Sequence, residues 1–340
     1  MNEVKVNIIT SDSKIWNLEL VWSELTLAFH QNLPIVINLN NEGPDIVELD
    51  DGKFLSYLKK LAAKYSYDLS KITVDTKNLV QKCSDINLKI TSPFYSINFA
   101  PYEIGPDLAI KKIDKHFGCF VYRSNGPRLY LSQHLYDQHK EKSILRFHWD
   151  NATEVHAHNI GLEYLINRFG FKDVSKQAQF LTNCPIVDKK ITIDTSISQN
   201  AAEQLLSNDQ QDFLKLYQTF FVEMVCETCF SGNVFFPSEK IWRPMLLRTP
   251  FIVQGPKDFL KNLKKLGFIT FDRWWSESYN EDWPGIESLE RITHVLDYIG
   301  SLDTKQLQSL YEEMLPVLEH NYHVVQSLKS DNVLRDFYDL

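Results

Sequence analysis

Two arginines around a short turn form the first candidate for chemistry. The run RSNGPR at 123–128 follows an apolar stretch that predicts a strand and opens a predicted helix. Guanidinium groups bind phosphate through paired hydrogen bonds, and a helix N-terminus adds partial positive charge. Arg123 is also the first arginine in the chain. We therefore expect Arg123, Asn125 and Arg128 to line an anionic pocket. The simpler alternative is a turn with two solvated arginines.

A second set of polar residues lies in the segment 223–255. Glu227 follows an apolar run typical of a buried strand, and Ser238 is placed to cap a helix that begins Glu239-Lys240. A carboxylate and an ammonium on that first turn could bind the hydroxyl and phosphate groups of a nucleotide sugar. The alternative interpretation is a capping residue followed by a surface ion pair, which is a common arrangement.

Length and composition limit which elements can position these residues. The chain has 340 residues, 44% of them hydrophobic and 24% charged, with a net charge of −8. This predicts about two globular domains and disfavours disorder and general nucleic-acid binding. Five scattered cysteines predict free thiols in a reducing compartment. The start lacks a signal-like apolar core and no segment has the length of a membrane helix, so we expect a cytoplasmic protein.

Short β-branched runs alternate with longer helical stretches, which is typical of βαβ units around a parallel sheet. No dinucleotide-binding GxGxxG follows the first strand, and no GxxxxGK[ST] motif occurs. The predicted strands are 4–10, 34–39, 72–75, 119–122, 143–148, 221–226 and 251–254. The predicted helices are 15–29, 54–65, 128–139, 239–247 (interrupted or begun late because of Pro244), 257–266 and a helical stretch from about 286 to the end.

The alternation predicts an α/β protein with two Rossmann-like domains that face a central cleft. The expected N-terminal domain is 1–110 and the expected C-terminal α/β domain is 111–285. A helical segment, 286–340, would then cross back over the domains. Open parallel sheets bind ligands at the carboxyl ends of their strands, so the candidate residues above fall where a ligand would sit.

Several blocks of sequence resemble glycosyltransferases of the GT-B type. The Glu-Thr after a buried strand, the Ser-Glu-Lys at a helix start and the run PFIVQGP are similar to the donor-binding half of α-1,3-fucosyltransferases. Residues 117–131 and 267–280 also resemble blocks shared by bacterial, phage and large-virus glycosyltransferase sequences. The matching blocks span about 115–280. Pro237-Ser238 differs from the family's usual residues, so the resemblance does not specify fucose.

The resemblance implies a role for each matching position. Glu239 and Lys240 would contact the donor's ribose and phosphate, with Arg243 on the same helix. Arg123 and Arg128 would hold the diphosphate, and Glu227 would touch the transferred sugar or the loop that does. GT-B enzymes neutralise the leaving diphosphate with positive side chains and a helix dipole, so the resemblance implies no metal and no cofactor beyond the nucleotide sugar.

An inverting transfer needs a carboxylate that accepts the acceptor's hydroxyl proton. Glu42 follows the second predicted strand, Asp12 follows the first, and Glu103 lies in the predicted interdomain loop. We rank them as Glu42, then Asp12, then Glu103. Each has an ordinary alternative as a loop acid, and a retaining enzyme would need no such base.

Histidines and cysteines elsewhere offer weaker signals. His148, His156 and His158 are close in sequence but lack a metal-binding spacing, so we favour His148 as a substrate contact and predict no metal site. Cys226 and Cys229 form a lone pair, best read as two buried thiols. Trp274, Trp275 and Tyr279 could stack on a sugar or base, although such aromatics more often pack in the interior.

The sequence thus predicts a metal-independent, inverting glycosyltransferase. The donor would be a GDP-sugar, or else a UDP-sugar, and the acceptor a glycan or lipid-linked molecule. No nucleic acid and no transmembrane segment are expected, and peripheral membrane contact stays open. Two alternatives remain, a non-catalytic glycan- or nucleotide-binding protein on the same fold and a nucleotide-sugar epimerase.

Overall fold

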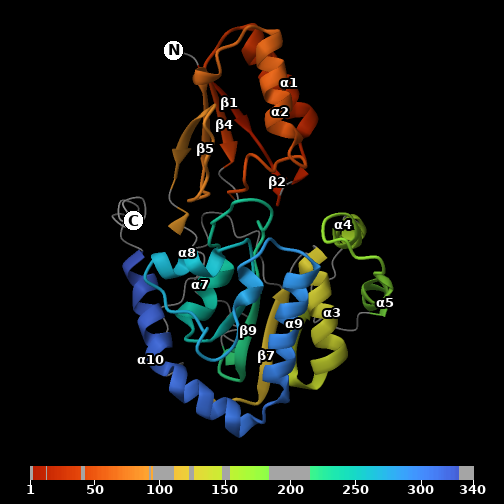
Figure 1. Ribbon diagram of the computed structural model, residues 1–340, viewed down its shortest axis with the longest axis vertical. Helices are drawn as coiled ribbons and strands as arrows, with labels where there is room; N and C mark the ends of the chain where they lie inside the picture. Colours follow the sequence, from red (N-terminus) through yellow and green to blue (C-terminus); the bar gives the residue numbers. More distant parts are fainter. Residues whose placement is uncertain are drawn as a thin grey trace. The chain divides into compact units, whose positions relative to one another are not determined.

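The computed structural model divides into two compact units (Figure 1). Unit 1 comprises residues 1–95, 227–238 and 255–262, and unit 2 comprises 96–226, 239–254 and 263–340. The predicted domain boundary at 110 lies outside the described residues. The structure describes residues 3–12, 14–39, 43–91, 93–94, 111–121, 126–147, 154–183 and 215–328.

Unit 1 is built on a four-stranded parallel sheet with the order β1-β4-β5-β6. Its strands are β1 (Val4–Asn7), β4 (Ile35–Leu39), β5 (Ile72–Thr76) and β6 (Asn87–Ile90), and β2 (Thr10–Ser11) pairs with β3 (Lys14–Ile15) in a separate hairpin. Its helices are α1 (Leu18–His30), α2 (Lys53–Lys64) and the short 3₁₀ helix η1 (Leu69–Lys71).

The core of unit 1 follows from the apolar periodicity of its elements. Ile35, Ile37 and Leu39 alternate toward the interior along β4, as the two-residue period of a strand requires. The helices bury residues spaced three or four apart, which is the period of one helical face. These buried helical residues are Val21, Leu25, Ala28 and Phe29 of α1, and Phe54, Leu58 and Ala62 of α2.

Unit 2 contains a second four-stranded parallel sheet, with the order β10-β9-β7-β8. Its strands are β7 (Lys115–Val121), β8 (Ser143–Phe147), β9 (Phe220–Cys226) and β10 (Phe251–Gln254). Its helices are α3 (Gly126–His139), α4 (Glu154–Asn167), α5 (Ser175–Asn183), α7 (Glu239–Leu246), α9 (Ile286–Ser301) and α10 (Thr304–Leu328), with 3₁₀ helices η4 (Lys140–Lys142) and η6 (Ser278–Asn280). The helix α8 (Phe259–Lys265) begins in unit 1 and ends in unit 2.

Two neighbouring strands of unit 2, the central β9 and the edge strand β10, are covered on both faces. Every residue of β9 and of β10 is buried, which is the pattern of a parallel sheet between two layers of helices. In Figure 1, α3 and α9 run side by side against this sheet. The order in which the chain adds strands reverses in the middle of this sheet. Strand β8 lies on one side of β7, whereas the later strands β9 and β10 lie on the other.

The expected α/β class with parallel sheets is confirmed, and most predicted elements are found within a few residues of their expected bounds. The sequence prediction omitted β6, the β2–β3 hairpin, α4 and α5. It was also wrong about Pro244, since α7 runs through this proline without a break. Proline removes only one backbone donor, and its neighbours keep their partners, because Leu247 N donates to Arg243 O (3.0 Å) and Thr249 N to Pro244 O (2.8 Å).

Candidate functional site

The reversal in strand order places the candidate site of unit 2 between β7 and β9. Ligands of open α/β sheets bind outside the carboxyl ends of the strands at the point where the order reverses. Here β7 and β9 are parallel neighbours, with Cys119 opposite Met224, so their carboxyl ends at Val121 and Cys226 lie at the same edge.

Arg128 connects the two strands at this edge. It lies in the first turn of α3, is only 6% exposed, and donates from Nη2 to the carbonyl oxygen of Cys226 at 3.3 Å. One side chain on the helix after β7 therefore reaches the last residue of β9. A guanidinium and a helix N-terminus meet at the reversal point, which is an arrangement suited to an anion.

A buried acid lies deeper in the same sheet. Glu223 is fully buried in the middle of β9, where Arg243 of α7 donates to Oε1 and the Tyr217 hydroxyl donates to Oε2 at 2.7 Å. Arg243 also lies over the ring of Phe120, with 5.3 Å between the guanidinium carbon and the ring centre. Arg243 therefore pairs with an acid of the sheet, in addition to its predicted role toward a donor.

Lys111 brings a further charge into this region. It is 5% exposed, and its ammonium donates to Thr249 Oγ1 at 2.6 Å and to Phe220 O at 3.2 Å. Burial lowers the pKa of Lys111 well below its ordinary value, and attraction to Glu223 opposes that shift only in part. Burial likewise raises the pKa of Glu223, against the opposing effect of Arg243.

The first turn of α7 carries the predicted pair Glu239 and Lys240. The ammonium of Lys240 lies 2.7 Å from Glu239 Oε1, and the two side chains are 25% and 39% exposed respectively. Burial disfavours the charged form of Glu239, but the ammonium of Lys240 and its hydrogen bond outweigh this and lower the pKa of Glu239. The ion pair that we considered as the ordinary alternative is therefore present at the predicted position.

Glu227 and Ser238 are brought together within unit 1. Both are buried, and the Ser238 hydroxyl donates to Glu227 Oε2 at 2.5 Å while the Ser238 amide approaches Oε1 at 3.4 Å. The serine expected to cap α7 thus pairs with the acid expected to contact the sugar. These two residues begin and end the segment 227–238, which belongs to unit 1 although it connects β9 to α7.

Asp12 fastens that same segment. Its backbone adopts a left-handed φ of 53°, and its buried carboxylate accepts from the amides of Phe230 and Ser231, both at 2.8 Å, and from the Ser231 hydroxyl at 2.5 Å. These contacts give the residue ranked second as catalytic base an anchoring role in unit 1.

A second acid and an amide hold the same segment further along. Asp45 accepts from the amide of Asn233 at 2.9 Å, and Asn78 Oδ1 accepts from the amide of Phe235 at 2.9 Å. Gly232 lies between these contacts with a φ of 80°, and a Cβ there would come within 2.7 Å of Asp45 Oδ2. The segment can adopt this path because position 232 is glycine.

Several predicted site residues lie outside the described part of the chain. The side chains of His156 and His158 are also not described. Cys226 and Cys229 are buried and form no disulfide, as expected. The undescribed positions are Glu42, Glu103, Arg123, Asn125 and His148.

Of the three aromatic residues predicted to stack on a ligand, two are buried and Trp274 is half-buried. Tyr279 is buried, and Trp275 is 6% exposed and stacks on Phe271 with ring centres 5.2 Å apart. A cavity of about 390 Å³ in unit 2 has both Trp274 and Trp275 in its wall, together with Arg291 and other residues. Its lining is Trp274, Trp275, Ser276, Ser278, Arg291, His294, Val295 and Tyr298.

The sequence prediction did not select Glu223, Lys111 or Tyr217. One signal was present, because Glu223 is the only charged residue in the apolar run FFVEMVC. A carboxylate inside a buried strand requires a buried partner. The sequence does not say which partner, since Arg243 is 20 positions away and Thr249, which holds Lys111, is 138 positions from it.

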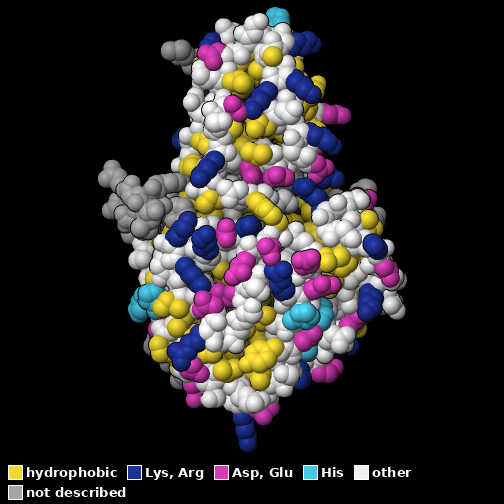
Figure 2. Space-filling model, viewed as in Figure 1, with side chains coloured by type: hydrophobic (Ala, Val, Ile, Leu, Met, Phe, Trp, Pro, Cys, Tyr) yellow, Lys and Arg dark blue, Asp and Glu magenta, His cyan; other side chains and the backbone are white. Residues whose placement is uncertain are grey.

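The surface shows acidic and basic side chains interspersed. On the face in Figure 2 they alternate over unit 2 instead of forming a stripe of one sign. In the described part of the chain, no helix combines the length and the apolar character needed to cross a bilayer.

Comparisons with protein-family models, with curated proteins and with solved structures found no match. The fold and the site described above therefore carry the functional argument.

Proposed function

We propose that this protein is a glycosyltransferase of the GT-B type that binds a nucleotide sugar through unit 2 and a glycan or lipid-linked acceptor through unit 1. The observation that carries the proposal is Arg128, which extends from the first turn of α3 to the end of β9 at the reversal of the strand order. A nucleoside diphosphate is the kind of anion that this position suits.

Catalysis would depend on charge at the leaving group. When the bond from the sugar to the diphosphate breaks, negative charge develops on the departing oxygen, and a fixed guanidinium with a helix N-terminus would stabilise it. Arg123 would add a second guanidinium. Lys240 would exchange its present partner Glu239 for a phosphate oxygen, which leaves the Glu239 carboxylate to accept from a ribose hydroxyl.

The acceptor's proton would pass to one of the three carboxylates ranked from the sequence. Glu42 remains the first candidate and Glu103 the third. Asp12 would have to act while its carboxylate also accepts three hydrogen bonds from Phe230 and Ser231. A GDP-sugar remains the favoured donor, with a UDP-sugar second.

The test measures whether nucleotide sugars raise the melting temperature. We expect one of the GDP-, UDP-, CMP- or dTDP-sugars to stabilise the protein, since a ligand at 100 times its Kd adds about 2.7 kcal/mol. Arg128→Gln should weaken that binding about 10- to 150-fold, because a charged hydrogen bond contributes about 1.5–3 kcal/mol. Arg128→Lys, which keeps the charge, should bind better than Arg128→Gln.

The matched control is Arg273→Gln, since Arg273 is 74% exposed and pairs with Glu313 in the same unit. It should leave the ligand-induced rise unchanged. Release of the free nucleotide, a diphosphate from GDP-, UDP- or dTDP-sugars and CMP from CMP-sugars, that depends on an added acceptor would then identify transfer. No stabilisation by any of these sugars, or equal binding by Arg128→Gln and the native protein, would overturn the proposal.

A further inference from the structure

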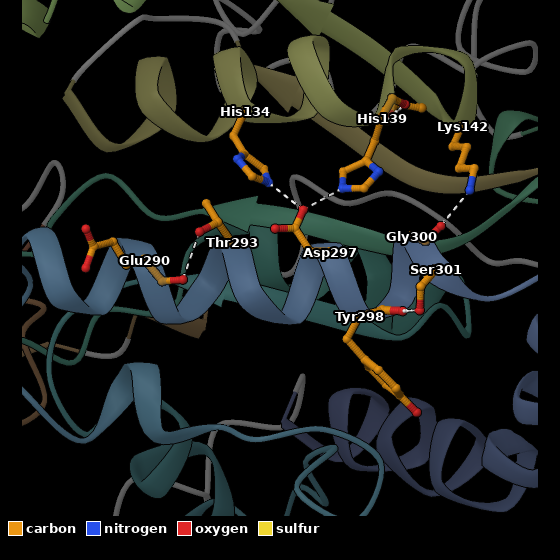
Figure 3. Close-up of polar contacts among 10 residues, drawn as sticks. His134, His139, Lys142, Glu290, Thr293, Asp297, Tyr298, Gly300 and Ser301 are labelled. Atoms are coloured by element: carbon orange, nitrogen blue, oxygen red, sulfur yellow. Dashed lines mark hydrogen bonds and ion pairs between the residues drawn. The ribbon is translucent and has the colours of Figure 1, made fainter.

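Three metal-ligating side chains converge on one surface of unit 2, away from the residues assigned to the donor. His134 and His139 reach from α3 toward Asp297 on α9 (Figure 3). Their Nε2 atoms lie 2.9 and 2.8 Å from the same atom, Asp297 Oδ1, and all three donor atoms lie within 4.8 Å of one another.

The backbone explains how two histidines five positions apart face one partner. Five residues of a regular α-helix would separate the two side chains by about 140° around the axis. The helix ends at His139, whose φ of −134° and ψ of 23° leave the helical region. The second imidazole can therefore turn toward the same side as the first.

The surrounding packing fixes the second imidazole. The ring of His139 lies 5.3 Å from that of Phe117 on β7. The same ring lies close to Gly300, where an added Cβ would come within 2.3 Å of it. Asp297 and Gly300 are one turn apart on α9. The helix therefore presents a carboxylate to α3 and, beside it, a position without a side chain that the His139 ring occupies. Lys142 also donates to Gly300 O at 2.6 Å, which holds this end of α9 in place.

The donor set matches one class of ion. Two imidazole nitrogens and one carboxylate oxygen are ligands that Zn²⁺ accepts, and a fourth position can be filled by water. Ligand atoms around a tetrahedral zinc ion are about 3.3 Å apart, given metal–ligand distances near 2.0–2.1 Å. The present distances to Asp297 Oδ1 are within about half an ångström of that value.

The three side chains also differ in exposure in a way that suits ion entry. The imidazoles of His134 and His139 are only 17% and 11% exposed, whereas the Asp297 side chain is 49% exposed. The carboxylate can shift outward while the rings stay fixed. Figure 2 shows histidine side chains at the surface over α9, with acidic side chains around them.

We propose that His134, His139 and Asp297 form a site for a divalent transition metal ion of the zinc class, which joins the end of α3 to α9. The ion would replace the protons that now bridge each Nε2 to Asp297 Oδ1. This inference is independent of the proposed glycosyl transfer. The sequence predicted no metal site. His139 and Asp297 are 158 positions apart, so these ligands form no short sequence motif that would reveal the site.

The experiment titrates the full chain with Co²⁺ and with Zn²⁺ alone. We expect one equivalent of Co²⁺ to give visible absorption of a four- or five-coordinate ion, and Zn²⁺ to displace it and raise the melting temperature. Asp297→Asn keeps an oxygen that accepts from both imidazoles but removes the charge, so it should fold normally. We expect it to weaken Zn²⁺ binding at least about 100-fold, beyond the 10–100-fold loss seen when only a hydrogen-bond partner of a ligand is removed.

His134→Gln should have the same effect, and Gly300→Ala should weaken binding by displacing His139. Two control variants should bind as the native protein does: His320→Gln on α10, which removes an imidazole that contacts Gly267 O, and Asp272→Asn, which removes an exposed carboxylate paired with Lys264.

Three results would overturn the proposal. One is native affinity in Asp297→Asn and His134→Gln. Another is a sulfur-to-cobalt charge-transfer band, which would place the ion on cysteines. The third is no binding of either ion, which would leave the three residues as a hydrogen-bonded link between helices.

Discussion

The two parallel sheets differ in how their strands follow the chain. In unit 1 the order β1-β4-β5-β6 runs in a single direction, so each new strand adds to the same edge. In unit 2 the chain adds β8 to one side of β7 and later adds β9 and β10 to the other. Among the described strands, only the second sheet contains a reversal, and with it the place where such sheets bind ligands.

The two units also differ in what their buried polar groups do. In unit 1, Asp12, Asp45 and Asn78 accept from backbone amides and fasten the segment 227–238. In unit 2, Glu223 lies inside the sheet and pairs with Arg243. Polar burial therefore secures a chain segment in one unit and places charge beneath the candidate ligand site in the other. Each prediction below tests this contrast.

The largest effect is expected at Glu223. Glu223→Gln preserves size but replaces one of the two accepting oxygens with an amide donor, and it leaves Arg243 and Lys111 without a buried negative charge, so the free energy of unfolding should fall by about 3–5 kcal/mol. In unit 1, Lys59→Met removes an ion pair with Asp85 whose side chains are 40% and 45% exposed, and should change the free energy of unfolding far less, because solvent screens an exposed pair. Urea unfolding followed by circular dichroism measures both.

A loss below about 1 kcal/mol for Glu223→Gln would contradict this picture. It would mean that the charge of Glu223 contributes little to the stability of the folded chain. The contrast between a charged sheet in unit 2 and a fastened segment in unit 1 would then fail.

A smaller and local effect is expected at Asp12. Asp12→Ala removes the acceptor of two amides and a hydroxyl and should cost about 1.5–3 kcal/mol. Asp12→Asn should cost less, because its amide oxygen still accepts and asparagine tolerates the left-handed φ of 53°. Hydrogen exchange at the amides of Phe230 and Ser231 should accelerate in Asp12→Ala.

Exchange that accelerates evenly across unit 1 would be the contrary result for Asp12→Ala. It would show that Asp12 supports the whole unit and does not specifically anchor the segment 227–238. The Asn variant serves as the control, because it changes the charge while preserving the backbone conformation.

The smallest effect is a pH dependence from Glu239. Its pKa is lowered from 4.5, so Glu239 contributes stability at pH values above 4.5 and loses that contribution as the pH falls through its lower value in the folded chain. Glu239→Gln cannot titrate, and its stability should therefore fall less steeply between about pH 5 and pH 2. Urea unfolding at several pH values gives both slopes. Identical slopes would show that the ion pair with Lys240 does not form in solution.

Elements with strong local patterns were predictable. The apolar run FIVQ, preceded by a proline and followed by a glycine, predicted β10 with its observed bounds, and the prediction for α3 began two residues late. Strand β6 was missed because its four residues, NLKI, alternate between exposed and half-buried positions and carry little apolar signal. Here pairing with β5 defines the strand more than the intrinsic preference of its residues does.

The sequence indicated which residues belong to the candidate site but not which residues they contact. Arg128, Glu239 and Lys240 stand out because of residue type and their place at helix starts. The contact of Arg128 with Cys226 spans 98 positions, and sequence spacing does not indicate contacts of that range. The pairing of Ser238 with Glu227 was not predictable for a similar reason, since the path of the loop between them is set by residues elsewhere in unit 1.

The division of the chain between the units has a consequence for folding during synthesis. Unit 1 draws on residues up to 95 and then on 227–238 and 255–262, so its last segment emerges about 170 residues after its sheet is complete. At a typical synthesis rate this delay is roughly 8–35 s. Phe230 and Ser231, from which Asp12 accepts, follow the last strand of the sheet by about 140 residues, so for most of that time the sheet must hold by its apolar core without these contacts. A nascent chain released within that window would carry an unfinished first unit, which makes it a natural substrate for chaperones and proteases.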